Sequence, residues 1–172
     1  MTHRVGIGYD IHRLEAGDGV VIAGVRVSCP YRVIAHSDGD VVLHALCDAL
    51  LGAVAAGDLG EHFPDTDAAH RGRDSREFVR AVLALPALAP WRLANLDVNI
   101  IAQAPRLAAH KPAMRAALAE LFSLPLDCIG LKARTNEGCD AVGEMRALQA
   151  QAVVLLERRS PEVRKSGSPE VR

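Results

Sequence analysis

The stretch AHSDGDVVLHALCDALLGAVAAGDLGEHFPDTD at residues 35–67 decides the fold expected for this chain. Its middle is apolar enough for a buried helix, yet acids and histidines stand within it and at both of its ends. Buried carboxylates and imidazoles cost free energy unless they are paired or bind a metal. The stretch therefore predicts a helix that carries chemistry, with the rest of the chain as its scaffold.

A helix is predicted over residues 40–54 of this stretch. Ser37 is the expected N-cap, with Asp40 three residues later as the acid of a capping box. Gly57 is the expected C-cap. The segment 59–73 that follows mixes glycine, proline, aspartate and histidine, and it is predicted to be a loop.

Hydrophobic periodicity predicts the elements on either side of this helix. The expected strands lie at residues 5–9, 20–27, 93–103, 129–134 and 147–157, and two further helices lie at 75–85 and 111–122. The first two strands are expected to pair, and residues 29–34 are expected to be a connector. This order predicts helices packed on one face of a mixed sheet, an α+β or α/β sandwich. Of these we expect an α+β fold whose mixed β-sheet contains four of the strands.

Length and composition favour a single domain followed by a tail. The chain has 172 residues, and its character changes at RRSPEVRKSGSPEVR, which contains SPEVR twice and has no periodic apolar face. We expect one domain over residues 1–157 and a flexible charged tail over residues 158–172. A tail that binds a partner is the alternative.

Charge, aromatic content and cysteine spacing exclude several classes of protein. The formal net charge is −1 and aromatic residues make up 3%, so neither a basic field nor many stacking rings are available for nucleic acid. No apolar run approaches the ~18 residues of a membrane span, and no membrane association is expected. Cys29, Cys47, Cys128 and Cys139 form no C-x-x-C pair, which argues against a thiolate zinc site and favours reduced thiols in a cytoplasmic protein.

Asp10, His12 and His44 are candidate metal ligands. Asp10 and His12 are two residues apart at the end of the first strand, so their side chains point to the same side. His44 on the apolar helix would add a third ligand, and one carboxylate with two imidazoles suits zinc with an open catalytic position. A nearby carboxylate would then orient the other ring nitrogen. Alternatively, Asp10 and His12 form a surface pair or a hydrogen bond within a loop. His44 could likewise be a core histidine that Asp40 or Asp48 holds by a hydrogen bond.

Four other segments could bind parts of a phosphorylated ligand. His36 and Ser37 stand at the helix entrance, where free N–H groups and the dipole favour phosphate, with plain capping as the alternative. The acids in residues 58–67 suit polyol hydroxyls, or they form a solvated loop. The strand end at 132–138 fits phosphate with a second divalent cation. Backbone groups in the loop at 102–107 could cradle a flat base.

The motifs D-x-H, AHSDGDVVLHAL, GDLGEHFPDTD, IIAQAPRL and KARTNEG follow one another within residues 4–157. In this combination the chain resembles the 2-C-methyl-D-erythritol 2,4-cyclodiphosphate synthase family of the non-mevalonate isoprenoid pathway. The resemblance implies a metal-dependent lyase that cyclises 4-diphosphocytidyl-2-C-methyl-D-erythritol 2-phosphate and releases CMP. It also implies a homotrimer with active sites between neighbouring subunits, each binding this small-molecule cytidine diphosphate substrate.

By the same resemblance, Asp10, His12 and His44 bind zinc, and Glu137 holds magnesium or manganese. His36 and Thr135 match the transition-state stabilisers of the family. The residues implied to bind phosphate, methylerythritol and the cytidine nucleotide are Asp10, His12, His36, Ser37, Asp58, Leu59, Gly60, Phe63, Pro64, Asp65, Thr66, Asp67, Ala102, Gln103, Ala104, Pro105, Arg106, Leu107, Ala108, Ala133, Arg134, Thr135, Asn136 and Glu137.

Three positions depart from the family pattern. Arg106 stands where the family usually has lysine, which keeps the charge but not the shape. Arg134 stands where the family usually has threonine, and Glu144 falls where a phosphate-binding arginine is expected. We expect Arg134 or Arg146 to supply the missing positive charge.

Two other classes of function fit the same residues. A zinc-dependent phosphoesterase would use the three ligands to activate water and would release inorganic phosphate or a linear product. A metal-stabilised trimer that binds nucleotide or isoprenoid would bind cytidine without releasing CMP. A structural zinc site normally has four protein ligands, and the count of three therefore favours an enzyme.

Overall fold

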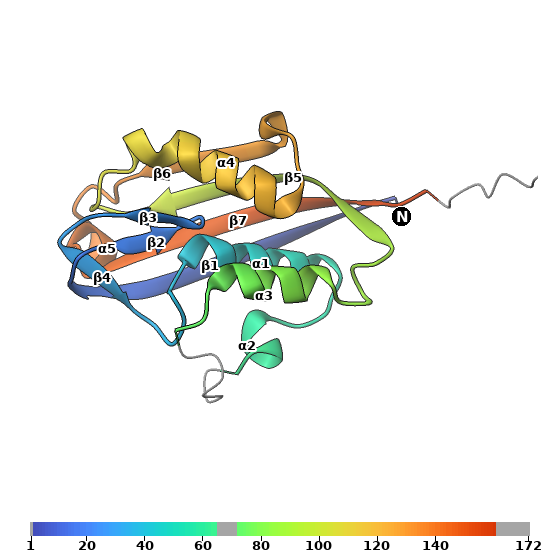
Figure 1. The fold of residues 1–172 in the computed structure, drawn as a ribbon, viewed down its shortest axis with the longest axis horizontal. Helices are drawn as coiled ribbons and strands as arrows, with labels where there is room; N and C mark the ends of the chain where they lie inside the picture. The colour runs from blue at the N-terminus through green and yellow to red at the C-terminus, as the bar shows by residue number, and fades with distance from the viewer. Residues whose placement is uncertain (1, 65–71, 161–172) are drawn as a thin grey trace, which may run out of the picture.

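The computed structural model describes residues 2–64 and 72–160 as one mixed β-sheet with helices on one face (Figure 1). The sheet has five strands in the order β4-β1-β7-β5-β6. Their bounds are β1 (His3–Ala16), β4 (Tyr31–Ile34), β5 (Trp91–Ile101), β6 (Ile129–Arg134) and β7 (Ala147–Arg158). All neighbours are antiparallel except β5 and β6, which are parallel and are joined by a helical crossover.

The helices lie over this sheet in two groups (Figure 1). α1 (Val41–Ala53) contacts β1 and β7, α3 (Ser75–Leu83) packs on α1, and α4 (Lys111–Phe122) contacts β6. The described residues also include two single-turn helices, α2 (Leu59–His62) and α5 (Asp140–Gly143), and short 3-10 turns at Ala108–His110 and Leu126–Cys128. A separate hairpin of β2 (Val20–Ile22) and β3 (Val25–Val27) contacts α1 and α4. No helix within the described residues is both long and apolar enough to cross a membrane.

The predicted count of four strands is wrong, since the main sheet has five. Residues 31–34, expected to be a connector, form the edge strand β4 and pair with the second half of β1. β1 was expected to end at Tyr9 because polar residues then interrupt the apolar alternation, but it continues to Ala16. Its predicted partner at 20–27 forms the β2–β3 hairpin instead.

β1 and α1 lie unusually close together, because two glycines face the helix. A Cβ atom built on Gly8 would lie 1.8 Å from the carbonyl oxygen of Ala45, and one on Gly6 would lie 1.8 Å from that of Ala49. Any larger residue would therefore push the helix away from the strand. This contact brings the first turns of α1 next to the polar residues of β1.

The N-terminus of α1 is capped by Asp40, and the expected cap at Ser37 is wrong. The Asp40 side chain accepts hydrogen bonds from the N–H groups of Val42 and Leu43 at 3.0 and 3.1 Å. It also accepts from Ala23 and Gly24 at 2.9 and 2.6 Å, in the turn between β2 and β3. Burial raises the pKa of this fully buried carboxyl despite the four N–H donors. Asp40 therefore joins the hairpin to the helix.

Most other boundaries lie within two residues of the periodic pattern, but the loop predicted at 59–73 begins with the short helix α2. α4 and β6 occupy the predicted residues, and β7 alternates as expected, with Leu148, Ala150, Ala152, Val154 and Leu156 buried on one side. α1 ends at Ala53 with Val54 as its C-cap, so the expected C-cap at Gly57 is wrong. Residues 161–172 of the predicted tail lie outside the described residues, and its flexibility stays a prediction.

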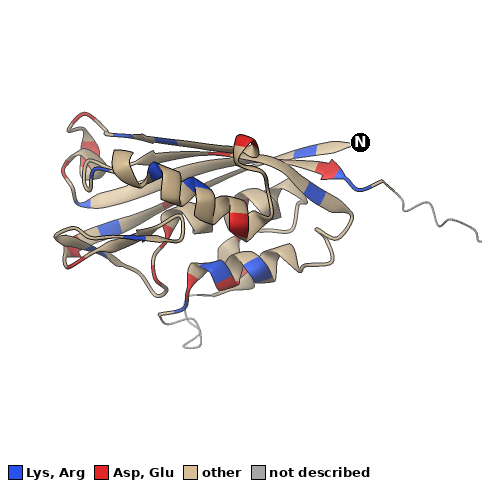
Figure 2. Cartoon of the chain, turned by 45° about the horizontal axis from the view of Figure 1, so that its top comes forward, with Lys and Arg blue, Asp and Glu red and all other residues tan. Residues whose placement is uncertain are grey.

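The opposite face of the sheet exposes apolar side chains. On β1 these are Val5, Ile7, Tyr9 and Ile11, with Ile7 74% exposed, and Val153 on β7 continues the patch. Val153 pairs with Ile7 across the two strands. Charged residues of both signs are interleaved along the helices and strands (Figure 2). Of the nine large apolar side chains exposed among the described residues, five lie together on this face of β1 and β7.

Candidate metal site and ligand pockets

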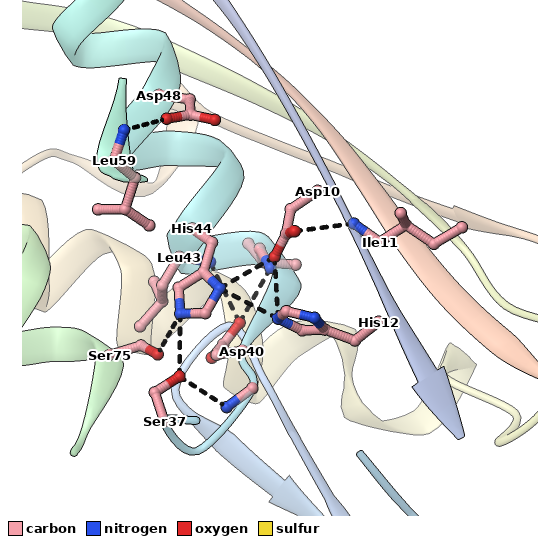
Figure 3. Close-up of polar contacts among 12 residues, drawn as sticks. Asp10, Ile11, His12, Ser37, Asp40, Leu43, His44, Asp48, Leu59 and Ser75 are labelled. Atoms are coloured by element: carbon pink, nitrogen blue, oxygen red, sulfur yellow. Dashed lines mark hydrogen bonds and ion pairs between the residues drawn. The ribbon is translucent and has the colours of Figure 1, made fainter. Parts of the chain in front are cut away.

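Asp10, His12 and His44 come together where β1 passes the first turns of α1 (Figure 3). Asp10 Oδ2 lies 2.9 Å from His44 Nδ1 and 3.1 Å from His12 Nε2, and the two nitrogens are 3.2 Å apart. The glycines of β1 make this possible, because His44 is one residue before Ala45, whose carbonyl lies over Gly8. Strand alternation alone places Asp10 and His12 together, and the helix supplies the third group.

The chemistry of these three atoms fits a divalent cation. Two imidazole nitrogens at 3.2 Å cannot both be bare acceptors facing each other, so a proton or a cation must lie between them. Tetrahedral zinc with ligand distances of about 2.0–2.2 Å would hold its ligands roughly 3.3 Å from one another. The observed separations of 2.9–3.2 Å are close to that value. One carboxylate and two imidazoles also leave one position open for a substrate oxygen.

The electrostatics of the cluster favour a bound positive charge. Burial would raise the pKa of Asp10, but hydrogen bonds from His12 and His44 outweigh it and hold the pKa below its usual range. Burial would lower the pKa of His44, yet the hydrogen bond to Asp10 and the negative charges of Asp10, Asp40 and Asp38 raise it above 6.5. The pocket therefore presents an ionised carboxylate, and a metal would replace the proton of His44.

The second ring nitrogen of His44 contacts hydroxyl groups. Nε2 lies 2.9 Å from Ser75 Oγ and 3.2 Å from Ser37 Oγ (Figure 3). The hypothesis that Asp40 or Asp48 holds this ring is wrong, because Asp40 caps α1 and Asp48 accepts from the N–H group of Leu59 at 2.8 Å. Ser75 was missed because only the fold brings the start of α3 to His44.

A cavity of about 260 Å³ opens beside the three candidate ligands. Several residues predicted to bind phosphate or polyol line this cavity, whereas Ile34, Ala35 and Phe78 were not predicted. The lining residues are His12, Ile34, Ala35, His36, Ser37, His44, Leu59, Phe63 and Phe78. Asp58, also predicted for the polyol, caps the short helix α2 by accepting from the N–H group of Glu61 at 2.9 Å. Gly60 lies in α2 and Pro64 just after it, whereas Asp65, Thr66 and Asp67 lie outside the described residues.

A second cavity, of about 330 Å³, lies at the carboxyl ends of the parallel strands β5 and β6. It brings together most residues predicted for the nucleotide, with Lys111 as an addition: Ala102, Gln103, Pro105, Arg106, Leu107, Ala108, Lys111, Ala133, Arg134 and Thr135. Ala104 precedes Pro105 through a cis peptide bond. Among the described residues, none lines both this cavity and the one beside His44.

The segment after β6 carries the candidate second metal ligand. Thr135 Oγ1 donates a hydrogen bond to Glu137 Oε1 at 2.9 Å, and both side chains are exposed. Asn136 donates to the Asp140 carboxylate at 2.7 Å and so turns away from them. Glu137 is therefore hydrogen-bonded to Thr135, a residue that lines the second cavity and was also predicted for the site. Asn136, predicted for the site as well, is instead hydrogen-bonded to Asp140.

The two arginines considered as a replacement for the family arginine have different surroundings. Arg134 lines the second cavity. Arg146 instead pairs with Glu144 at 2.6 Å and borders another hollow near Ile11 and Arg13. Of the two, Arg134 is therefore the one that lies among the residues predicted for the nucleotide.

Comparison with known proteins gives one consistent result. The model of the YgbB family matches residues 3–157. A relative from Chromohalobacter salexigens, 53% identical over 91% of this chain and 96% of its own, is named 2-C-methyl-D-erythritol 2,4-cyclodiphosphate synthase. A relative from Methylococcus capsulatus with the same name is 52% identical over 91% of this chain and 99% of its own.

Solved structures agree with this result. A 2C-methyl-D-erythritol-2,4-cyclodiphosphate synthase, 42% identical, aligns over 90% of this chain and all of its own chain with a TM-score of 0.82. An IspF of Plasmodium falciparum in complex with CDP, 28% identical, covers 92% of this chain and 98% of its own with a TM-score of 0.80. The chain thus matches such proteins in sequence and in fold.

Proposed function

The chain belongs to the YgbB family, and we propose that it converts 4-diphosphocytidyl-2-C-methyl-D-erythritol 2-phosphate to 2-C-methyl-D-erythritol 2,4-cyclodiphosphate with release of CMP. This is a metal-dependent lyase reaction of the non-mevalonate isoprenoid pathway. The observation that carries the proposal is the meeting of Asp10, His12 and His44 beside a cavity lined by His36 and Ser37. Relatives with the corresponding name at about half identity support it.

The reaction is an intramolecular phosphoryl transfer. An oxygen of the 2-phosphate forms a bond to the β-phosphorus, the bond from that phosphorus to the oxygen of the α-phosphate breaks, and CMP leaves with that oxygen. The attacking oxygen is already an anion, so no strong general base is needed. Catalysis then depends on positioning and on neutralising charge. That need agrees with a site built of metal ligands, hydroxyls and cations.

Asp10, His12 and His44 would hold zinc, and Glu137 would hold magnesium or manganese. When bound, these cations supply neutralisation for the phosphate oxygens. The donor set at Asp10 suits zinc because it combines one carboxylate with two imidazoles. Glu137 suits a hard cation that keeps most of its other ligands from water and substrate phosphates.

The roles of the remaining residues follow from their chemistry. His36 and Ser37 would donate hydrogen bonds to the phosphates in the cavity beside His44. Once Glu137 holds a cation, the Thr135 hydroxyl would donate to the transferring phosphate instead of to Glu137. His36 and Thr135 together would stabilise the transition state of that phosphate. Asp58, Leu59 and Gly60, together with Phe63, Pro64, Asp65, Thr66 and Asp67, would hold the methylerythritol. The loop from Ala102 to Ala108 would hold the cytidine.

The protein is proposed to act as a homotrimer with each active site between two subunits. One support is that the metal cluster and the nucleotide cavity of one chain have no lining residue in common within the described part. Another is the apolar patch of Val5, Ile7, Tyr9, Ile11 and Val153, which is exposed in the single chain. A neighbour seated on this face would cover the patch and bring its nucleotide cavity to the metal. A cytoplasmic location agrees with the four free cysteines.

The trimer can be tested with one substitution on the apolar patch. Ile7→Glu should yield monomers in analytical ultracentrifugation and abolish CMP release, while each monomer still binds one zinc. Leu126→Glu is the matched control, because Leu126 is 51% exposed on a turn outside the patch. A monomeric Ile7→Glu protein with full activity would exclude an active site shared between subunits.

The reaction itself is tested with the authentic phosphorylated cytidyl substrate, zinc and magnesium. CMP should appear together with a cyclic diphosphate in the phosphorus NMR spectrum. Inorganic phosphate or a linear product would instead identify a phosphoesterase. Cytidine binding without CMP release would identify a non-catalytic binding protein.

A further inference from the structure

We propose that Ser75 is a positioning residue for the metal site and that Asp38 acts through it, keeping the ring proton of His44 on Nε2 so that Nδ1 is free for the cation. The inference rests on the proposed metal binding at Asp10, His12 and His44. It assigns a function to two residues that no part of the proposed reaction uses.

The contacts form a chain from the metal cluster into the protein. Ser75 Oγ lies 2.9 Å from His44 Nε2. The same hydroxyl makes a very short hydrogen bond to Asp38 Oδ1, and the backbone N–H group of Ser75 donates to Asp38 Oδ2 at 3.1 Å. Ser75 is fully buried, and it is the first residue of α3. The start of α3 is therefore tied to His44 by way of a single hydroxyl.

The direction of each hydrogen bond follows from the acceptors present. Asp38 also accepts from the N–H group of Asp40 at 3.3 Å, so its two oxygens receive three donors, which suits an ionised carboxylate. An ionised carboxylate only accepts, and the single hydroxyl proton of Ser75 must point to Asp38. Ser75 Oγ can then only accept from His44, whose proton lies on Nε2. Nδ1, 2.9 Å from Asp10 and 3.2 Å from His12, is left to bind the cation.

Ser37 is the other hydroxyl near His44, and it is less suited to this task. Its Oγ lies 3.2 Å from Nε2 and accepts from the N–H group of Gly39 at 3.1 Å. Ser37 also lines the cavity and is proposed to meet phosphate. Ser75 does not line that cavity and is sealed from solvent, so its bond to His44 persists whether or not substrate is bound. Metal sites commonly use such a contact to hold a histidine ligand.

Zinc affinity of the purified full-length protein tests the inference. Competition with a chromophoric chelator should show zinc binding that is about 10- to 100-fold weaker in Ser75→Ala than in the unaltered chain. The control is Asp74→Ala, which removes the N-cap bond from Arg76 N–H to Asp74 at 2.9 Å and weakens α3 without touching His44. Asp74→Ala should keep the zinc affinity. Unchanged affinity in Ser75→Ala, or an equal loss in Asp74→Ala, would overturn the inference.

A double-mutant cycle tests whether Asp38 acts through Ser75. Asp38→Asn should weaken zinc binding, but adding it to Ser75→Ala should cause no further loss. If the losses of zinc affinity in the two single variants add up in the double variant, Asp38 does not act through Ser75. With Co²⁺ in place of zinc, the visible absorption bands of Ser75→Ala should shift, because the orientation of a ligand ring changes, whereas those of Asp74→Ala should not.

These measurements separate the inference from the function on which it rests. If His44→Ala binds zinc as tightly as the unaltered chain, the proposed metal site itself is wrong. If His44→Ala loses zinc and Ser75→Ala does not, only the positioning function of Ser75 fails.

Discussion

The candidate metal cluster of Asp10, His12 and His44 and the second cavity, proposed above to bind the nucleotide and called here the nucleotide cavity, differ in how complete they are within one chain. At the metal cluster, the candidate ligand atoms of Asp10, His12 and His44 lie within 3.2 Å of one another. The Ser75 hydroxyl contacts the His44 ring, and the Ile11 N–H group donates to Asp10. At the nucleotide cavity, Arg134 and Thr135 are exposed, and the buried Gln103 Oε1 accepts no hydrogen bond from the described residues. The first region is preorganised by the fold, whereas the second has groups still to be satisfied by a ligand or a neighbouring subunit.

The largest expected effect comes from removing a ligand at the preorganised region. His44→Ala should lower turnover by roughly 10³-fold, because the neutralisation lost with the cation is worth several kcal/mol. Zinc content by elemental analysis should fall in parallel, while cytidine nucleotide binding, measured by calorimetry, should remain. Near-normal turnover in zinc-depleted His44→Ala protein would remove the metal cluster from the mechanism.

The close contact of β1 with α1 should be the next most sensitive feature. Gly8→Ala should lower the free energy of unfolding by about 3 kcal/mol, because the added Cβ overlaps the Ala45 carbonyl. Gly52→Ala is the matched control, since its nearest new contact would be the Ile7 oxygen at 3.8 Å. This control should be neutral or stabilising by about 0.5–1 kcal/mol. Urea denaturation measures both, and equal stabilities for the two variants would contradict the contact.

A smaller and more selective effect is expected at the nucleotide cavity. Arg134→Ala should raise KM for the cytidyl substrate by roughly 10- to 100-fold through loss of a charge-assisted hydrogen bond, with zinc affinity unchanged. Arg146→Ala is the matched control, because Arg146 is already paired with Glu144. Steady-state kinetics measure KM for both variants. A higher KM in Arg146→Ala alone would show that Arg146, and not Arg134, contacts the phosphate.

The smallest expected effect is the pH dependence of the metal-free protein. The folded pKa of His44 is raised above 6.5 by Asp10, so its contribution to stability is fully present below that pH. The contribution is lost as pH rises through the folded pKa. Urea unfolding of chelator-treated protein between about pH 5.5 and 9 should show this decline, and His44→Ala should lack it. A decline that persists in His44→Ala would assign it to another group.

The sequence predicts the candidate metal ligands better than the residues that hold those ligands and their helix in place. Asp10 and His12 share one side of any extended strand, and His44 stands on a helix that apolar spacing marks as buried. α4 and β6 likewise occupy their predicted residues, since local periodicity determines them. Local sequence spacing therefore suffices to name the three candidate metal ligands.

Other features depend on segments that are distant in sequence. Asp40 is the N-cap in place of Ser37 because the hairpin at Ala23 and Gly24 also donates to it. Residues 31–34 become an edge strand because β1 extends far enough to pair with them. No local pattern contains these partners.

What the sequence by itself determined is the kind of chemistry: which side chains can bind a metal or a phosphate, and on which element each one lies. What only the tertiary structure decided is their arrangement. Two glycines let α1 approach β1, which brings His44 to Asp10, and the start of α3 places Ser75 against the far side of the His44 ring. The physical reason is that hydrogen-bond partners and close packing depend on distances in space, which sequence spacing encodes only within one helix or strand.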